Sequence, residues 1–253
     1  LQSRLIIKRS TTQLQCIKIK VRTMSGRVGS ITTDIIADGL VFNMDAANRA
    51  SYPKTGTTAT DTVGNKTGTI SGAVFVSDGQ GGFDFDGSDD VITTNLVYSL
   101  SSATTEFSCG CWFKAGTQTS GKLLVSNYNF TPIPFNLYLK SDGTCQGTSR
   151  NSSYTTISVG SGDTYDDNEY HNFYYQRDSN NIYYTYVDGI LKNTGTATLG
   201  AIATTNAIRI GKLGQYTQGY FDGIINTVQI YNRALSSNEV LHNYNALKGR
   251  FGL

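Results

Sequence analysis

The acidic residues of this 253-residue chain bear most directly on whether it could catalyse a reaction. Hydrolysis of a glycosidic bond needs two carboxylates placed on either side of the sugar. The chain has three glutamates, Glu106, Glu169 and Glu239, and each is isolated in the sequence. No Gly-x-Ser-x-Gly elbow and no glycine-rich phosphate loop with a lysine is present. We therefore expect that the protein is not an enzyme.

The tyrosines are the side chains best suited to binding. The chain has 16 of them against a single tryptophan. Segments 171–177 and 182–187 alternate as hairpin strands, so one residue of each adjacent tyrosine pair must face away from the core. Exposed tyrosines in one patch would suit a glycan or a protein partner, whereas the alternative is that they half-bury as ordinary strand formers. The candidate contact residues are Tyr165, Tyr170, Tyr174, Tyr183, Tyr184 and Tyr186.

The cysteines and histidines do not have the spacing of a metal site. Cys109 and Cys111 fall on one face of a predicted strand together with two phenylalanines, so we expect buried free thiols. His171 and His242 have no second histidine or cysteine at ligand spacing, which favours structural roles. The cysteine pattern does not indicate a disulfide-stapled secreted domain.

The elements that must position these residues are mostly short strands. Low charge (16%), 27 glycines and only 3 prolines are typical of an all-β chain with many polar turns. No apolar run of about 18 residues is present, so we expect no membrane span. One helix is predicted near 237–247, because Ser236 and Glu239 have the spacing of a capping box after a strand. Val240, Leu241 and Tyr244 would dock this helix onto the strands.

An ordered set of motifs resembles the laminin-G-like, concanavalin-A-like jelly rolls. The family opens with a Gly-Leu-Val strand and closes with a Tyr-Asn-Arg-Ala-Leu-Ser segment and a helix. The matching segments here are Asp38–Ala46, Asp61–Asn65, Phe83–Ile92, Phe107–Lys114, Tyr186–Gly189 and Gly219–Val240. The resemblance covers about residues 34–253 and implies a two-sheet antiparallel jelly-roll sandwich, with Trp112 and Phe113 on a central strand.

The same resemblance raises the question of calcium, because many laminin-G-like domains hold this ion. Carboxylates, amides and carbonyls are the oxygen ligands that calcium takes. The candidate ligands are Asp45, Asp61, Asn65, Asp86, Asp89 and Asp90. Asn226 stands where many members have an acid, which removes a charge that could hold the metal. The alternative is that these aspartates stabilise their turns by accepting local amide hydrogen bonds.

Charge divides the chain in two. Residues 1–33 contain seven of the 21 cations and no acid, so the remaining 14 cations meet all 19 acids, for a formal net charge of −5. We interpret 1–33 as a basic leader or arm and 34–253 as the jelly-roll domain. The leader is either a disordered or non-native segment, with Met24 as a plausible initiator, or an arm that grips an anionic or neighbouring surface.

The resemblance implies a non-enzymatic structural or adhesive protein. Similar domains occur in virion proteins of tailed bacteriophages, as capsid decorations and tail appendages. We therefore expect capsid or tail subunits or cell-surface glycans as partners, a virion or extracellular location, and no nucleic-acid partner. A carbohydrate-binding, lectin-like domain of a bacterial secreted protein is the alternative.

Overall fold

The computed structural model describes residues 35–127, 131–213 and 219–253, and the predicted basic leader lies outside them. The described chain consists mainly of strands, with one α-helix and two short 3₁₀ turns. The strands are β1 (Leu40–Asp45), β2 (Thr58–Thr60), β3 (Thr67–Ser71), β4 (Val74–Val76), β5 (Gly82–Asp86), β6 (Val91–Val97), β7 (Phe107–Lys114), β8 (Lys122–Ser126), β9 (Ile133–Leu139), β10 (Thr144–Arg150), β11 (Thr156–Thr164), β12 (Tyr170–Arg177), β13 (Ile182–Val187), β14 (Ile190–Thr196), β15 (Ala207–Ile210) and β16 (Asp222–Tyr231). The helix is α1 (Ser237–Lys248), and the 3₁₀ turns are η1 (Asp78–Gln80) and η2 (Gly249–Phe251).

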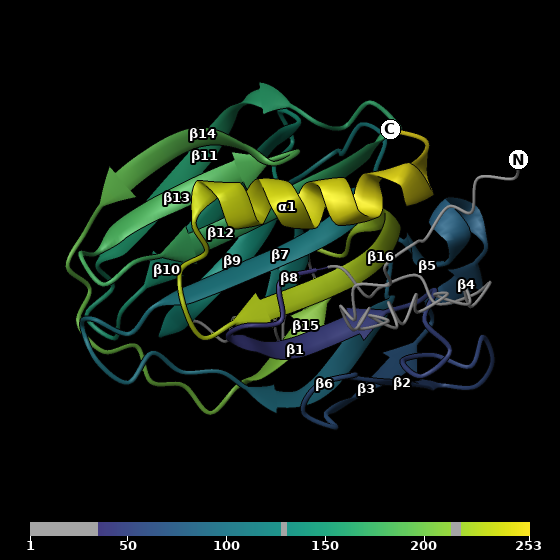
Figure 1. Ribbon diagram of the computed structural model, residues 1–253, viewed down its shortest axis with the longest axis horizontal. Helices are drawn as coiled ribbons and strands as arrows, with labels where there is room; N and C mark the ends of the chain where they lie inside the picture. Colours follow the sequence, from purple (N-terminus) through teal and green to yellow (C-terminus); the bar gives the residue numbers. More distant parts are fainter. Residues whose placement is uncertain (1–34, 128–130, 214–218) are drawn as a thin grey trace, which may run out of the picture.

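The strands form two antiparallel sheets of eight strands each. Sheet A has the order β14-β13-β12-β7-β16-β5-β4, and β1 also pairs with β16. Sheet B has the order β11-β10-β9-β8-β15-β6-β3-β2. Helix α1 lies across the outer face of sheet A, and sheet B lies behind (Figure 1). The predicted two-sheet jelly-roll sandwich with one C-terminal helix is confirmed.

The main core lies between the two sheets. Each strand alternates, so that apolar side chains such as Phe85, Ile92, Leu137 and Ile210 face inward and are almost completely buried. The described cysteines, Cys109, Cys111 and Cys145, are free and buried in this core, as the sequence predicts for the first two. Burial raises the pKa of each of these thiols, which keeps them protonated.

Strand β7 is buried on both faces. Phe113 faces the core between the sheets, whereas Trp112 faces outward and stacks on Tyr244 and on Phe251, with ring centroids 5.5 Å and 4.2 Å away. The outer face of sheet A therefore carries a second apolar layer beneath α1 and η2. This layer explains why Trp112, on a central strand as predicted, is fully buried.

Helix α1 begins at the predicted capping box. The Ser236 side chain accepts from the Glu239 amide, and the Glu239 carboxylate accepts from the Ser236 amide. The helix ends at Lys248, one residue beyond the prediction. Its buried residues are Val240, Asn243 and Leu247, so the expected contact of Leu241 is wrong in part because its side chain remains 42% exposed. None of the described helices is long and apolar enough to span a membrane.

Candidate functional site

The predicted exposed patch of tyrosines does not form. Five of the six candidates have 6% exposure or less, namely Tyr165, Tyr170, Tyr174, Tyr183 and Tyr186. Tyr174 and Tyr186 do leave the core between the sheets, as strand alternation predicts. They then pack against Val240 and Leu235, because α1 and the chain before it cover this face of sheet A. Periodicity correctly predicted which way these side chains point, but the expectation of exposure was wrong.

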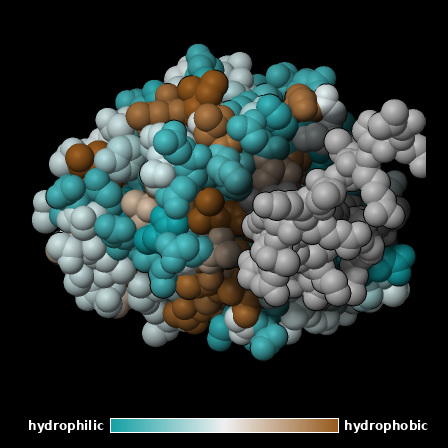
Figure 2. Space-filling view, in the orientation of Figure 1, coloured by the Kyte–Doolittle hydropathy of each residue, from teal (hydrophilic) through white to brown (hydrophobic). Residues whose placement is uncertain are grey.

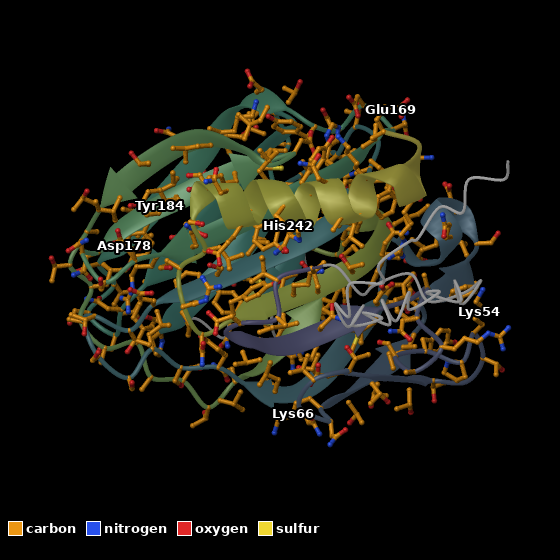
Figure 3. All side chains as sticks on the ribbon, in the orientation of Figure 1. Lys54, Lys66, Glu169, Asp178, Tyr184 and His242 are labelled. Atoms are coloured by element: carbon orange, nitrogen blue, oxygen red, sulfur yellow. The ribbon has the colours of Figure 1, made fainter. Side chains whose placement is uncertain are left out.

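Tyr184 is the candidate that remains accessible. It lies with Tyr186 in a pocket of about 340 Å³ between the β12–β13 hairpin and the start of α1. The two rings stack with centroids 6.3 Å apart and an interplanar angle of 28°. Asp178, also in this pocket, accepts a 2.9 Å hydrogen bond from the Tyr184 hydroxyl. Both residues lie outside the N-terminal end of α1, on the side away from the helix (Figure 3). Burial and the neighbouring Asp178 carboxylate raise the pKa of Tyr184 to about 12, so the phenol remains a donor.

Carboxylates and hydroxyls form the rim of this pocket. Glu106 accepts hydrogen bonds from the Ser179 and Ala234 amides at 3.2 Å and 3.0 Å, which fixes its carboxylate at the rim. Ser236 and Ser237 add hydroxyls at the start of α1, and Ser237 is within 3.1 Å of the Tyr186 hydroxyl. An aromatic surface next to fixed carboxylates and hydroxyls suits a sugar, whose C–H faces stack and whose hydroxyls donate and accept hydrogen bonds.

Exposed apolar residues gather beside α1 rather than in this pocket. Ile190 and Leu191 on β14 are 58% and 44% exposed, and Leu241 lies close to Gly189 in the preceding turn. The same face of the molecule has apolar surface along β14 and over β1, separated by polar surface (Figure 2). The Tyr184 pocket is therefore distinct from the exposed apolar residues, and its chemistry is polar and aromatic.

Asp45, a candidate calcium ligand, is already paired with a cation from the chain. Its Oδ2 accepts from Arg250 Nη1 at 3.0 Å, and both side chains are buried. Arg250 also donates to the carbonyls of Gly79 and Gly81, and Asn226 Nδ2 donates to the Gly81 carbonyl at 2.8 Å. Since a guanidinium fills this set of oxygens, the Asp45 carboxylate is paired by the chain's own cation, and the structure does not support Asp45 as a calcium ligand.

Asp61 and Asn65 fit the alternative interpretation of turn residues. The Asp61 carboxylate accepts from the amides of Asn43, Val63 and Gly64 at 2.7, 3.0 and 2.6 Å. Asn65 adopts a positive φ of 57°, a conformation that asparagine tolerates in turns. These interactions stabilise the loop between β2 and β3 without requiring a metal.

The remaining calcium candidates do come together. Carboxylate oxygens of Asp86, Asp89 and Asp90 lie within 4.8 Å of one another, and among the described residues no other such group of His, Cys, Asp or Glu is found. Asp90 is buried, and its Oδ2 accepts from the Asp86 amide at 2.9 Å. Burial, with the acidic neighbours, raises the pKa of Asp90. Calcium binding at this turn stays a prediction.

Several residues of these sites were not singled out from the sequence as binding or pairing partners. Asp178 and Glu106 lie in the same pocket as Tyr184 only because β12, β13 and the chain before α1 pack together. Arg250 reaches Asp45 across 205 positions in the sequence. The available signal for Arg250 was weak: a cation directly after the predicted helix stop at Gly249.

Comparison with solved structures identifies binding domains of a mosquitocidal protein and of botulinum neurotoxins with the same fold. The binding domain of Paraclostridial Mosquitocidal Protein 1 matches with a TM-score of 0.66 and 16% identity, over 82% of this chain and 52% of that chain. The receptor binding domain of botulinum neurotoxin D matches with a TM-score of 0.64 and 14% identity, over 82% and 52%. The botulinum neurotoxin D ligand binding domain in complex with N-acetylneuraminic acid gives 0.65 and 14%, over 82% and 51%. The chain thus spans about half the length of these structures, and at such identities the likeness concerns the fold.

No curated protein matches the sequence. A family model does: the one described as the concanavalin A-like lectin/glucanases superfamily matches residues 85–241. That range holds β6 to β16 and the start of α1, including Tyr184 and Asp178 of the pocket. With more than half of the chain matched and the jelly-roll sandwich in place, the chain belongs to the concanavalin A-like lectin/glucanase superfamily, in its laminin-G-like branch.

Proposed function

We propose that the protein is a non-enzymatic carbohydrate-binding module and that the Tyr184 pocket is a sugar-binding site. The observation that carries this proposal is the stacked Tyr184–Tyr186 pair beside the Asp178 and Glu106 carboxylates in one open pocket. The solved toxin domains of the same fold support it, since their names describe receptor binding and one holds N-acetylneuraminic acid.

The positions of the glutamates support a binding role over hydrolysis. Glu239 is held by Arg233 and by the capping box, and its pKa is lowered to about 2, chiefly by the Arg233 contact. Glu106 accepts two backbone amides, and Glu169 is exposed. The three described glutamates thus lie apart from one another, and the two carboxylates of the pocket, Asp178 and Glu106, accept hydrogen bonds from the Tyr184 hydroxyl and from two backbone amides, which supports a binding role for them.

A glycan array with Tyr184 variants tests this proposal. Tyr184→Ala should weaken binding at least about fivefold, because an aromatic contact in a binding site contributes more than about 1 kcal/mol. Tyr184→Phe keeps the ring and should retain most of the affinity. Tyr154→Ala, at a 62% exposed tyrosine on a different loop, is the matched control. If the unaltered protein binds no glycan, the proposal is wrong; if it binds glycans and Tyr184→Ala has no effect, the site lies elsewhere.

The finer role that we propose is that of a tailed-phage virion component, a capsid decoration or tail appendage that binds glycans or neighbouring subunits. It rests on the resemblance of the opening and closing motifs, Asp38–Ala46 and Gly219–Val240, to domains of such proteins. A carbohydrate-binding domain of a bacterial secreted protein is the alternative. Capsid and tail genes beside the coding sequence, or a symmetric array of the domain on purified particles, would support the virion role over the alternative.

A further inference from the structure

The Tyr184 pocket carries two carboxylates whose hydrogen-bond donors within the described chain are all neutral. Asp178 accepts from two amides that follow it in the chain and from the Tyr184 hydroxyl. Glu106 accepts from the Ser179 and Ala234 amides. Because Ser179 directly follows Asp178, the turn between β12 and β13 fixes both carboxylates at one side of the pocket.

The wall of the pocket is negatively charged. No lysine, arginine or histidine lines it, and neither carboxylate forms an ion pair with a cation of the described chain. Arg233, close by in sequence, is paired with Glu239 at 2.6 Å and with Asp38 at 2.9 Å. Arg177 is buried opposite Tyr183, on the core face of sheet A, and donates to backbone carbonyls there. Each of these arginines therefore has partners outside the pocket.

The groups that would meet a ligand are accessible. Asp178, Glu106 and Tyr184 are partly exposed, and the two serines at the start of α1 are exposed. Tyr186 is buried and stacks on Tyr184, so it supports the accessible ring rather than meeting a ligand itself. A ligand in this pocket therefore contacts one tyrosine ring beside two carboxylates.

The pocket offers a ligand mainly hydrogen-bond acceptors. An ionised carboxylate only accepts, and its two oxygens keep free lone pairs after two or three bonds. The Tyr184 hydroxyl already donates to Asp178, and the Ser236 hydroxyl donates to Glu239. A ligand must therefore supply donors, and an ammonium group supplies three together with a positive charge. The face of a tyrosine ring attracts the same group within about 6 Å.

The start of α1 is the feature that opposes a cation, because the free amides of a helix N-terminus carry a partial positive charge. This end of the helix is capped. The Glu239 carboxylate accepts from the Ser236 amide and hydroxyl, and the Ser236 side chain accepts from the Glu239 amide. An acidic cap offsets the partial charge of the amides, so α1 does not cancel the two pocket carboxylates.

We propose that the Tyr184 pocket selects a sugar with a free amino group, whose ammonium lies between the Asp178 and Glu106 carboxylates and against the Tyr184 ring. The inference deepens the proposed function by naming the ligand class, and it rests on that function. N-acetylation of the sugar would remove the charge and two of the three donors. A sugar carboxylate would meet two like charges, which is unfavourable.

A pair of oligosaccharides with one backbone tests the proposal with the full-length protein. The probes are the β-1,4-linked hexamer of glucosamine and its fully N-acetylated form, with hexalysine as a cation that is not a sugar. The variants are Asp178→Asn, Glu106→Gln and the double variant. Glu169→Gln is the control, since it removes the same charge at an exposed position away from the pocket (Figure 3). Binding is measured by calorimetry at about pH 6, where a sugar amine is largely protonated, and melting curves confirm that each variant is folded.

We expect the unaltered protein to bind the glucosamine hexamer at least tenfold more tightly than the N-acetylated hexamer. Asp178→Asn and Glu106→Gln should each weaken binding of the glucosamine hexamer about threefold to tenfold, as expected for partly exposed charged contacts. The double variant should bind the two hexamers equally, and Glu169→Gln should keep the full preference.

Four results would overturn the inference. The first is equal or tighter binding of the N-acetylated hexamer, and the second is a double variant that keeps the preference seen in Glu169→Gln. In both, binding that is still lost in Tyr184→Ala leaves the proposed function intact. The third is binding of hexalysine without binding of the glucosamine hexamer, which would identify a protein cation as the ligand. The fourth is that no probe binds; binding of another sugar on the glycan array would then leave the proposed function intact, and no binding there would overturn both.

Discussion

Arg250 holds together three segments that are distant in sequence. Its guanidinium contacts the Asp45 carboxylate at the end of β1 and the carbonyls of Gly79 and Gly81, which lie in and directly after η1, before β5. Burial raises the pKa of Asp45, and the contact with Arg250 opposes that rise. Buried Asn226 completes the group, with its Oδ1 unpaired among the described residues. A chain cation thus fills an oxygen-lined position for which the sequence suggested calcium.

Arg250→Ala should therefore destabilise the fold strongly. Removing one partner leaves the Asp45 charge buried and unpaired, which costs about 3–5 kcal/mol in comparable cases. The free energy of unfolding from urea titration measures the effect. Arg150→Ala, at a partly exposed arginine with a neutral partner, should change it by less than about 1 kcal/mol. A similar small loss for Arg250→Ala would show that the buried pair is not required for stability.

Asp86 gives a separate test of calcium binding. It lies directly opposite Asp222 in the β5–β16 register, and like charges in such pairs repel by about 0.2–1 kcal/mol. Without calcium, Asp86→Asn should raise the free energy of unfolding slightly.

If calcium binds at Asp86, Asp89 and Asp90, a hundredfold excess over Kd should stabilise the unaltered protein by about 2.7 kcal/mol, and Asp86→Asn should reduce that gain. A melting temperature insensitive to millimolar calcium and to chelator contradicts calcium binding.

His171 couples stability to pH. Its Nδ1 lies 2.8 Å from Asp188 Oδ2, and its Nε2 lies 3.1 Å from Asp167 Oδ1. Burial opposes protonation of the ring, but the contacts with the two carboxylates together raise its pKa above the ordinary 6.5. Because the pKa of His171 is higher in the folded than in the unfolded protein, protonation of its ring stabilises the fold fully below about pH 6.5. This contribution is lost as the pH rises through the pKa of the folded state.

Asp188→Asn should lower the pKa of His171 and reduce the stability difference between pH 6 and pH 8. Asparagine tolerates the positive φ of 53° at this position, so the turn should be retained. The imidazole resonances of His171 followed by NMR during a pH titration give the pKa directly. Asp142→Asn, at an exposed aspartate paired with Lys140, is the control. An unchanged His171 titration in Asp188→Asn would mean that Asp188 does not stabilise the protonated ring.

At the scale of elements, the sequence predicted α1 itself better than its effect on the sheet. The start of α1 depends on contacts three residues apart, Ser236 with Glu239, so a local pattern sufficed. Which sheet face it covers depends on long-range packing of Val240 on Tyr174 and Tyr231, which periodicity does not encode. This is why the tyrosines were predicted to point correctly and yet were expected to be exposed.

The capping box and the docking of α1 can be tested together. Ser236→Ala should cost about 0.5–2 kcal/mol, because the Glu239 amide loses its side-chain acceptor. Truncation after Leu235 should lower the melting temperature much further, since it exposes Trp112 and Tyr174 and removes Arg250. Asn238→Ala, also in the first turn, is the control. An unchanged melting curve after truncation would show that α1 does not stabilise the sandwich.

For the whole molecule, the fold was predictable because its motifs follow one another in a fixed order along the chain. Pairings such as β5 with β16 then bring Asp84, Asp86 and Asp222 close together, where β5 ends and β16 begins. In sheet B, Thr93, Arg209, Ser126 and Asn136 lie opposite one another and likewise come from four different strands. No local pattern predicts such rows, because each depends on the register of several strands at once.

The separation of charge between the basic leader and the net-acidic domain leads to the last prediction. The described chain is anchored from its first residues, since Ile35 packs near Trp112 and the Ile36 amide donates to Asn243 Oδ1 at 2.8 Å. Deleting residues 1–33 leaves these contacts in place, so the melting temperature of the sandwich should remain nearly unchanged.

If the leader binds a neighbouring copy or a particle surface, the same deletion should abolish that attachment. Attachment by the intact protein should also weaken with added salt, because exposed charges are screened over about 8 Å at physiological ionic strength. Sedimentation with purified particles, or analytical ultracentrifugation of the protein alone, measures attachment. An intact mass from the native source that begins at Met24 or Ser25, or attachment that survives the deletion, contradicts a role for the arm.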